Sequence, residues 1–184
     1  VLSSHVDQTI AIRLTASKPG MINFDTELRG VRNSAHSNYA TDYFRMDGKE
    51  ENELILTGKS ADYMGIEGKL RYEARAQVHA NGGKVERNGT RIKVSNSNSA
   101  TILFVAATNF IDYKNVSGNE KASVQQYLEN LENKDYDTIK NGALKDYKVL
   151  FERVELDLPS TSNSYLPTDE RMVNIQTNPD PQMS

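Results

Sequence analysis

Apolar and polar side chains alternate along Leu70-Arg-Tyr-Glu-Ala-Arg-Ala-Gln-Val78, a stretch of nine residues. A period of two is typical of a β-strand with one buried face, because successive side chains point to opposite sides of a sheet. The apolar side runs from Leu70 to Val78. The polar side, from Arg71 to Gln77, is expected to point toward water. This run is the longest of its kind in the chain, and it favours a β-rich fold.

Similar runs surround this stretch and are separated by glycine-rich turns. The predicted strands span residues 9–15, 21–28, 53–58, 69–80, 84–87, 90–95 and 100–109. The turn Lys18-Pro-Gly20 separates the first two runs, which we interpret as a hairpin. A second, tight hairpin is predicted at Asn88-Gly89, because this pair tolerates positive φ. The sequence therefore predicts a mainly β chain built as an antiparallel β-sandwich.

The hydrophobic period changes after residue 116, where helices are expected. The first helix has an apolar stripe at i, i+3, i+4 and i+7: Val124, Tyr127, Leu128 and Leu131. Ser117 and Glu120 have the spacing of a capping box at its start. Asp135 suits the cap of a second helix, whose stripe consists of Ile139, Ala143, Tyr147, Leu150 and Val154. A short strand at 154–158 and a third helix capped by Thr168 complete the prediction of two to three linker α-helices.

The composition excludes several classes of protein. The chain has 184 residues and a formal net charge of −3, and its basic residues are scattered among acidic ones, so a nucleic-acid partner is not expected. The absence of cysteine rules out disulfides, thiolate catalysis and zinc–cysteine sites. No apolar run is long enough for a membrane span. No Walker loop, G-x-G-x-x-G or G-x-S-x-G is present, so no cofactor is expected.

Residues 29–51 form a long polar segment without apolar periodicity, and long loops of this kind are often functional. Four side chains in it combine amide, imidazole and phenol groups that hydrogen-bond to sugars or stack on them: His36, Asn38, Tyr39 and Tyr43. They are our candidate substrate-binding residues. An ordinary surface loop is the alternative interpretation.

The remaining histidines, His5 and His79, have no metal-ligand partner at a suitable helical spacing, and neither does His36. We interpret all three as surface or packing residues. The carboxylates are numerous, but most of them fall in predicted loops or on solvated faces. No catalytic residue and no metal ligand is therefore assigned in this chain.

Several segments, in this order along the chain, resemble one family. They are His5-Val-Asp-Gln-Thr-Ile-Ala-Ile-Arg-Leu-Thr-Ala-Ser-Lys-Pro-Gly20, Gly68-Lys-Leu-Arg-Tyr-Glu-Ala-Arg75, Ala106-Ala-Thr-Asn-Phe-Ile-Asp-Tyr-Lys-Asn-Val-Ser-Gly118, Asp146-Tyr-Lys-Val-Leu-Phe-Glu-Arg-Val-Glu-Leu-Asp-Leu158 and Leu166-Pro-Thr-Asp-Glu-Arg-Met172. Together they resemble the N-terminal domain and linker of glycoside hydrolase family 95, the α-L-fucosidases.

The resemblance implies part of an N-terminal β-sandwich domain at 1–112 and a helical linker at 113–184 that leads to a missing (α/α)6 barrel. In the family the barrel carries the catalytic residues, and terminal α-L-fucosides are hydrolysed with inversion. The chain by itself is then expected to be inactive. Two alternatives stay open: a stand-alone carbohydrate-binding β-sandwich module, or the same domain of an α-L-galactosidase or a related barrel glycosidase.

The resemblance also sets expectations about partners and location. The chain starts at Val1 without an initiating methionine, and the family's domain begins well before Thr9, so the sandwich is expected to be incomplete. An exposed strand edge would then favour self-association of the fragment. The implied partners are the barrel of the same parent chain and, through the parent, fucosylated glycans. Family analogy points to a bacterial protein of the periplasm or the extracellular space.

Overall fold

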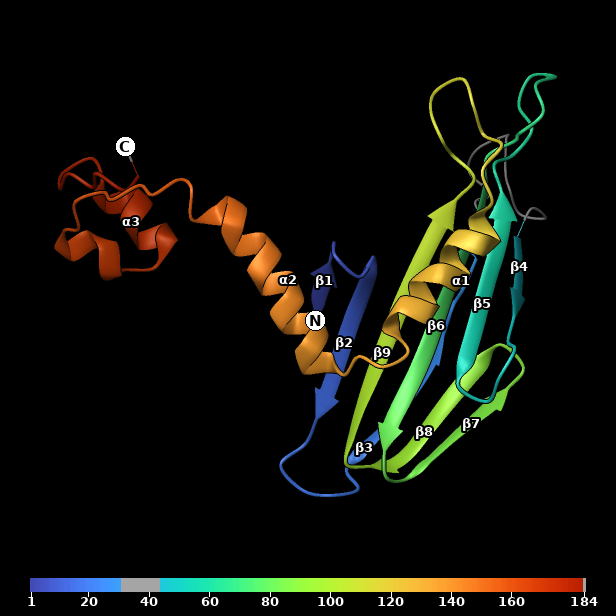
Figure 1. Ribbon diagram of the computed structural model, residues 1–184. Helices are drawn as coiled ribbons and strands as arrows, with labels where there is room; N and C mark the ends of the chain where they lie inside the picture. The colour runs from blue at the N-terminus through green and yellow to red at the C-terminus, as the bar shows by residue number, and fades with distance from the viewer. Residues whose placement is uncertain (31–43, 184) are drawn as a thin grey trace. The chain divides into compact units, whose positions relative to one another are not determined.

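The computed structural model describes residues 1–30 and 44–183 (Figure 1). It divides into two compact units, Val1–Asp146 and Tyr147–Ser184. Among the helices of these described residues, none combines the length and the apolar character that a membrane span needs.

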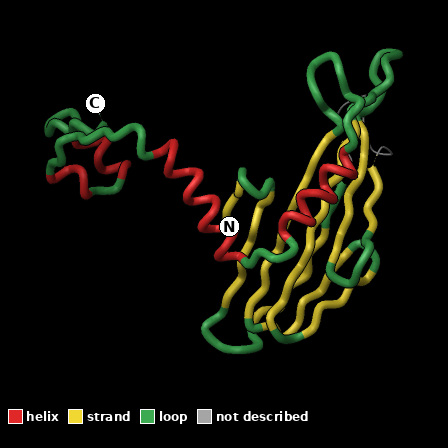
Figure 2. The backbone as a smooth tube through the Cα atoms, in the orientation of Figure 1, coloured by secondary structure: helices red, strands yellow, loops and turns green. Residues whose placement is uncertain are grey.

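The first unit contains two antiparallel sheets, which appear in yellow in Figure 2. The larger sheet has the strand order β1-β2-β9-β6-β5-β4, and the smaller has the order β3-β8-β7. The strands are β1 (Leu2–Ser4), β2 (Thr9–Thr15), β3 (Ile22–Glu27), β4 (Phe44–Asp47), β5 (Glu53–Lys59), β6 (Arg71–Asn81), β7 (Lys84–Asn88), β8 (Arg91–Ser97) and β9 (Ser99–Thr108). The prediction of a mainly β, antiparallel chain followed by helices is confirmed.

Two apolar clusters hold this unit together. One lies between the sheets and is formed by the fully buried side chains of Leu54, Val78, Ile92 and Val94. The other lies on the opposite face of the larger sheet, beneath α1 (Glu120–Leu131). Its buried members are Ala11, Leu103, Val105, Val124, Leu128, Leu131 and Ile139. The larger sheet is therefore covered on both faces, by the smaller sheet and by a helix.

The first two helices begin close to the predicted N-cap residues, but the cap of α1 is a different residue from the one predicted. Asn119, and not Ser117, caps α1, because its Oδ1 accepts a hydrogen bond from the Ala122 amide at 3.1 Å. The predicted stripe of α1 is confirmed, since Val124, Leu128 and Leu131 are buried. Asp135 caps α2 (Tyr136–Phe151) as expected, with its Oδ1 2.8 Å from the Thr138 amide nitrogen. Ile139 is the buried residue of α2.

The predicted hairpin across Lys18-Pro-Gly20 is wrong. Strand β2 pairs with β1 and β9 in the larger sheet, whereas β3 pairs with β8 in the smaller one. Gly20, at φ 72°, turns the chain from one sheet to the other, and its amide donates to Asn98 Oδ1 at 2.9 Å. By contrast, the hairpin at Asn88-Gly89 is confirmed: Asn88 pairs with Arg91, and Gly89 has φ 61°.

The expectation that the polar face of β6 points toward water is also wrong. This face lies against α1, and Glu73 is only 2% exposed. The alternation correctly separates the two faces of β6. It does not show which face a helix from a distant part of the chain will cover.

The second unit is short and contains no strand in its described part. It consists of the end of α2, a 3-10 turn at Ser162–Tyr165 and α3 (Thr168–Asn174). The strand expected at 154–158 is absent, because this unit offers no strand for it to pair with among residues 147–183. The cap expected at Thr168 is also wrong, since Pro167 takes that position and Thr168 is the first helical residue.

One ion pair organises the second unit. Arg171 donates from Nε to Asp180 Oδ2 at 2.7 Å and from Nη2 to Asp180 Oδ1 at 2.8 Å. The Asp180 side chain is fully enclosed. The bidentate hydrogen bond from Arg171 holds the pKa of Asp180 below its usual value, so this carboxylate stays ionised.

Candidate functional site

The four candidate substrate-binding residues, His36, Asn38, Tyr39 and Tyr43, lie outside the described residues. The strand that follows them is informative. Strand β4 begins at Phe44, which pairs with Gly58 near the end of β5. The chain therefore re-enters the larger sheet at the end where the loop after β5 leaves it.

Two loops extend from that end of the sandwich (Figure 1). They connect β5 to β6 and β9 to α1. Six large apolar side chains at their tips are each more than half exposed: Tyr63, Met64, Ile66, Phe110, Ile111 and Tyr113. A concentration of apolar side chains on adjacent loops is typical of an interaction surface, whereas single exposed ones are common on any protein. We call these six residues the loop-tip patch.

The bases of the two loops are joined by Asn109, which is completely buried. Its Oδ1 accepts from the Arg71 amide at 2.7 Å, and its Nδ2 donates to the carbonyl oxygens of Lys69 at 3.1 Å and Val116 at 2.5 Å. Each loop also closes on itself through one antiparallel bridge, Tyr63 with Ile66 and Asp112 with Asn115. The patch therefore stands on a hydrogen-bonded base.

Charged side chains beneath α1 form a buried network on β5 and β6. Arg75 donates from Nε to Glu73 Oε1 at 2.7 Å, and its Nη1 lies 3.5 Å from Glu53 Oε1. Gln77 Nε2 donates to Glu53 Oε2 at 2.7 Å. Both carboxylates are almost inaccessible to solvent, so their charges depend on these few partners.

A hollow of about 320 Å³ opens beside this network, where the chain passes from α1 to α2. Its walls come from β2, β6, β9 and the connection between the helices. Six polar side chains contribute to the wall: Arg13, Gln77, His79, Asn81, Ser99 and Thr101. At the mouth, Lys134 Nζ lies 2.6 Å from Oδ1 of the buried Asp7, which fixes the connection against the turn between β1 and β2.

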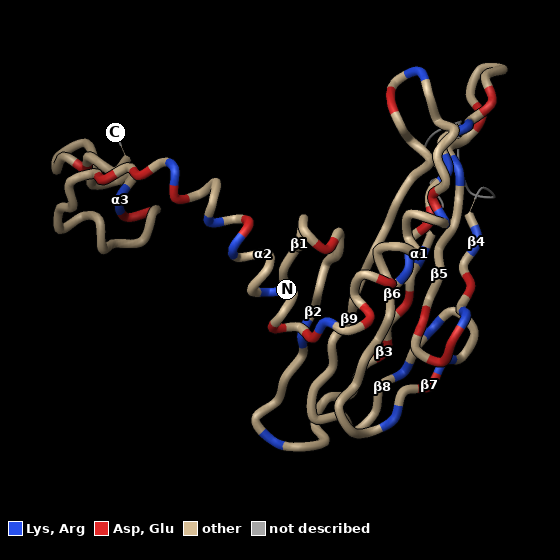
Figure 3. The backbone as a smooth tube through the Cα atoms, viewed as in Figure 1, with Lys and Arg blue, Asp and Glu red and all other residues tan. Residues whose placement is uncertain are grey.

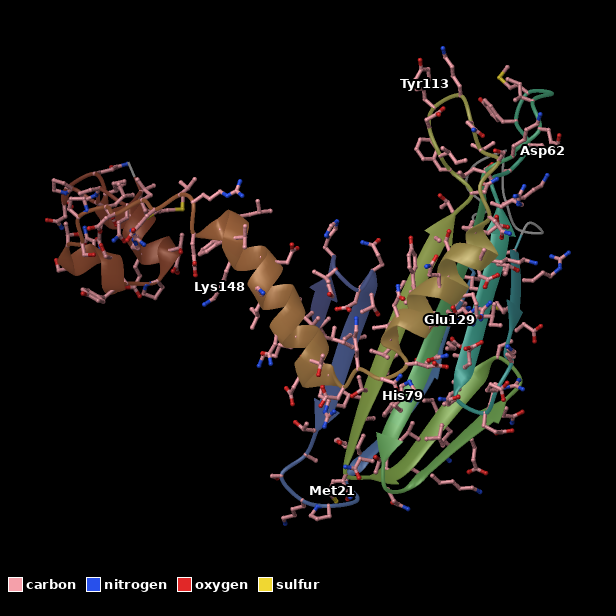
Figure 4. All side chains as sticks on the ribbon, viewed as in Figure 1. Met21, Asp62, His79, Tyr113, Glu129 and Lys148 are labelled. Carbon is pink, nitrogen blue, oxygen red and sulfur yellow. The ribbon has the colours of Figure 1, made fainter. Side chains whose placement is uncertain are left out.

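His79 lines this hollow, and Figure 4 labels it on β6 below α1. Desolvation of the imidazole lowers the pKa of His79 below its usual value of 6.5, although much of the residue remains accessible. The ring is therefore neutral at pH 7 and can donate one hydrogen bond and accept another. The exposed position of His79 fits its interpretation as a surface or packing residue.

The charges of the first unit are mixed, with acidic and basic residues interspersed along the strands (Figure 3). No group of three or more His, Cys, Asp or Glu side chains within residues 1–30 and 44–183 is arranged to hold a metal ion. The sites that stand out in this part of the chain are thus the loop-tip patch and the hollow that His79 lines. Sequence reasoning identified neither, because each combines residues that are far apart in the chain. The signal for the patch was the run of apolar residues within otherwise polar turns.

Taken together, the two sheets and the covering helix define a β-sandwich domain. The chain belongs to the glycosyl hydrolase family 65, N-terminal domain family, whose model matches residues 1–113. It is also similar to a protein of Arabidopsis thaliana named Alpha-L-fucosidase 2, with 27% identity over 212 aligned residues. That alignment covers 98% of this chain but only 24% of the relative.

The comparisons agree with the sequence resemblance on the class of protein, a glycoside hydrolase N-terminal domain. They differ on the family number, because the matching family carries the number 65 and the resemblance is to family 95. Membership of family 95 stays a prediction.

Proposed function

We propose that this chain is the non-catalytic N-terminal domain, residues 1–112, and the helical linker, residues 113–184, of an α-L-fucosidase. In this proposal the complete enzyme hydrolyses terminal α-L-fucosides with inversion, and the catalytic groups lie in an (α/α)6 barrel of the same parent chain. The observation that carries the proposal is the similarity to Alpha-L-fucosidase 2 along 98% of this chain. Membership of a glycosyl hydrolase N-terminal domain family supports it.

The role we assign to the domain is to pack against the barrel and support the entrance to its active site. The loop-tip patch supports this role, because six exposed apolar side chains on a rigid base favour burial against a partner. The second unit also has exposed apolar side chains, whose burial against a partner would be favourable. Among them, Leu150, Phe151, Val154 and Leu156 are each more than 60% exposed.

Further parts of the proposal follow from family analogy. Fucosylated glycans would be contacted through the parent enzyme, and His36, Asn38, Tyr39 and Tyr43 remain candidates for such contact. A bacterial protein of the periplasm or the extracellular space is the expected setting. The isolated chain is expected to self-associate through apolar surfaces that the barrel would otherwise cover.

The test is a fucose-release assay with 2′-fucosyllactose and an aryl α-L-fucoside. The complete parent enzyme and this 184-residue chain are compared under identical conditions. We expect activity in the parent and none in the chain. Turnover by the highly purified chain would disprove its non-catalytic role. If the parent leaves both fucosides intact and releases L-galactose from an aryl α-L-galactoside, the related α-L-galactosidase alternative replaces the fucosidase proposal.

The docking role has its own test in the parent enzyme. Replacing Ile66 and Tyr113 together by Ser should lower kcat/KM by about tenfold or more, because a misplaced support shifts the groups that hold substrate. Met21→Ser is the matched control, since Met21 is 62% exposed and Figure 4 labels it at the opposite end of the sandwich from Tyr113. Equal activity of both variants would exclude the loop-tip patch as a docking surface.

A further inference from the structure

The hollow that His79 lines has a neighbour. A second hollow of about 170 Å³ adjoins it, and Gln77 and Glu132 line both. The smaller hollow lies where β5 and β6 face α1, and it includes Glu53, Arg75 and Gln125. We call the two together the paired hollow.

Arg13 is held in place within the larger part. Its Nη1 donates to Thr101 Oγ1 at 3.1 Å, and its Nη2 donates to Ser99 Oγ at 3.3 Å. The guanidinium also lies 6.0 Å from the ring centroid of Tyr136, within reach of a cation–π contact. Because a guanidinium has five N–H donors, these two hydrogen bonds leave donors available to a ligand.

The smaller part contains the carboxylate of Glu53, which is almost completely buried. Glu53 Oε1 is buried and accepts no hydrogen bond from residues 1–30 and 44–183. Its nearest cation is Arg75, whose Nη1 lies 3.5 Å away, beyond good hydrogen-bond geometry. This oxygen has almost no accessible surface, so it contributes charge to the smaller part and does not itself contact a ligand.

The charges around the paired hollow nearly cancel. Four basic side chains line it, Arg13, Lys49, Arg75 and Lys134, against five acidic ones, Glu50, Glu53, Glu129, Glu132 and Asp135. No single sign dominates, and donors and acceptors are interleaved. This wall suits an uncharged ligand with many hydroxyl groups, because each hydroxyl both donates and accepts a hydrogen bond.

We propose that the paired hollow is a binding site for a neutral carbohydrate of one or two rings, in which Arg13, His79 and Tyr136 contact the ligand. The larger part, at about 320 Å³, lies near the lower end of the range for small-molecule sites. This site lies on the α1 face of the larger sheet and does not depend on which glycosidic bond the parent enzyme cleaves. It would bring a sugar to the domain itself.

The experiment is an NMR titration of the chain with L-fucose, D-galactose, lactose and maltose. Glucuronate and glucosamine serve as anionic and cationic comparisons. We expect saturable shifts at the amides of Ser99, Thr101 and Gln77, with a Kd on the order of 1 mM for at least one neutral sugar. Arg13→Met and His79→Leu should each weaken binding by about tenfold. Arg91→Met, an exposed arginine on β8, should not change it.

Several results would overturn the proposal. They are the absence of saturable shifts up to about 50 mM sugar, binding retained in both site variants, or tighter binding of glucuronate or glucosamine than of any neutral sugar. Two site variants are used so that a folding defect in one leaves the other informative. A negative titration leaves the fucose-release test unaffected, because that test reports on the parent's catalytic groups.

Discussion

Arg71 donates from Nε to Glu120 Oε1 at 3.0 Å and so joins the first residue of β6 to the first residue of α1. A second bond runs from Nη2 to Glu120 Oε2 at 3.3 Å, and the same nitrogen reaches the Gly118 carbonyl oxygen. The Glu120 side chain is only 8% exposed. This contact fixes where the helix begins on the sheet.

The pair makes stability depend on pH. Burial opposes ionisation of Glu120, but the hydrogen bond and the charge of Arg71 outweigh it, so the pKa lies below its usual value of 4.5. Since the folded pKa is lowered, the contribution is complete above pH 4.5 and is lost as the pH falls through the folded pKa. We expect Glu120→Gln to cost about 1–3 kcal/mol at pH 7.

Urea unfolding of both proteins between pH 7 and pH 3 checks this prediction. The two stability curves should converge in acid, because protonation removes from the wild type the charge that the variant already lacks. Glu129→Gln is the control, as Glu129 is exposed on the same helix and should have little effect. A constant difference at every pH would show that Glu120 acts by packing alone.

The two ends of α2 should respond differently to truncation. Ile139 is 1% exposed within the apolar cluster beneath α1, whereas Leu150 is 62% exposed. We predict that Ile139→Ala lowers the free energy of unfolding by about 2–5 kcal/mol. Leu150→Ala should stay within about 0.5 kcal/mol of wild type. Thermal or urea unfolding followed by circular dichroism measures both, and similar losses would contradict the assignment of Ile139 to the core.

Removing the Asn109 side chain should loosen both loops of the patch together. Asn109→Ala eliminates three hydrogen bonds to the backbone groups of Arg71, Lys69 and Val116, which we expect to cost about 2–4 kcal/mol. The Arg71 amide should also exchange with solvent faster, as measured by hydrogen exchange. Asn133→Ala, at an exposed position, is the control. Unchanged exchange at Arg71 would argue against a shared base.

Alanine substitutions at two glycines with positive φ distinguish the cost of backbone strain from the cost of steric overlap. Gly89, at φ 61°, has open space around it, so Gly89→Ala should cost only the left-handed penalty of about 1–2 kcal/mol. Gly83, at φ 70°, faces the Ser95 carbonyl oxygen, which a Cβ would meet. Gly83→Ala should therefore cost a further ~1–3 kcal/mol. Equal unfolding midpoints for the two variants would refute this difference.

Sedimentation velocity tests self-association of the isolated chain. The outer strands of the larger sheet, β1 and β4, have only three and four residues, which limits pairing along their edges. We therefore assign self-association to exposed apolar side chains. The average sedimentation coefficient should rise with concentration, and the Ile66→Ser, Tyr113→Ser double variant should reduce the rise. A sedimentation coefficient that stays at the monomer value at every concentration would exclude self-association.

Local sequence patterns predicted most of the strands and both long helices of this chain. Alternation located β6 to within a residue or two, and the apolar stripe of α1 identified Val124, Leu128 and Leu131 as buried. The pairing of strands was harder to predict, because the residues of the turn at Gly20 do not show that β3 joins a different sheet from β2. Turn residues specify a change of direction, whereas pairing depends on contacts between residues far apart in sequence.

The candidate sites could not be predicted for the same reason: they depend on contacts between residues far apart in sequence. The paired hollow depends on the register that places Arg13 opposite Thr101 and Gln77 opposite Glu53. Neither pairing leaves a trace in the spacing of residues along the chain. The charged face of β6 looks solvated in sequence because its cover, α1, begins about 40 residues after that strand ends.

The pairing of β2 with β9 has a consequence for the order in which this chain folds. Ile10 pairs with Phe104, so a strand made early must wait for about 90 further residues before its partner exists. At a synthesis rate of roughly 5–20 residues per second, β2 stays without that partner for about 5–20 s on the ribosome. The β6–β9 ladder can close with a much shorter connecting segment. We therefore expect the N-terminal strands to join the larger sheet late and to be the part most exposed to mispairing during synthesis.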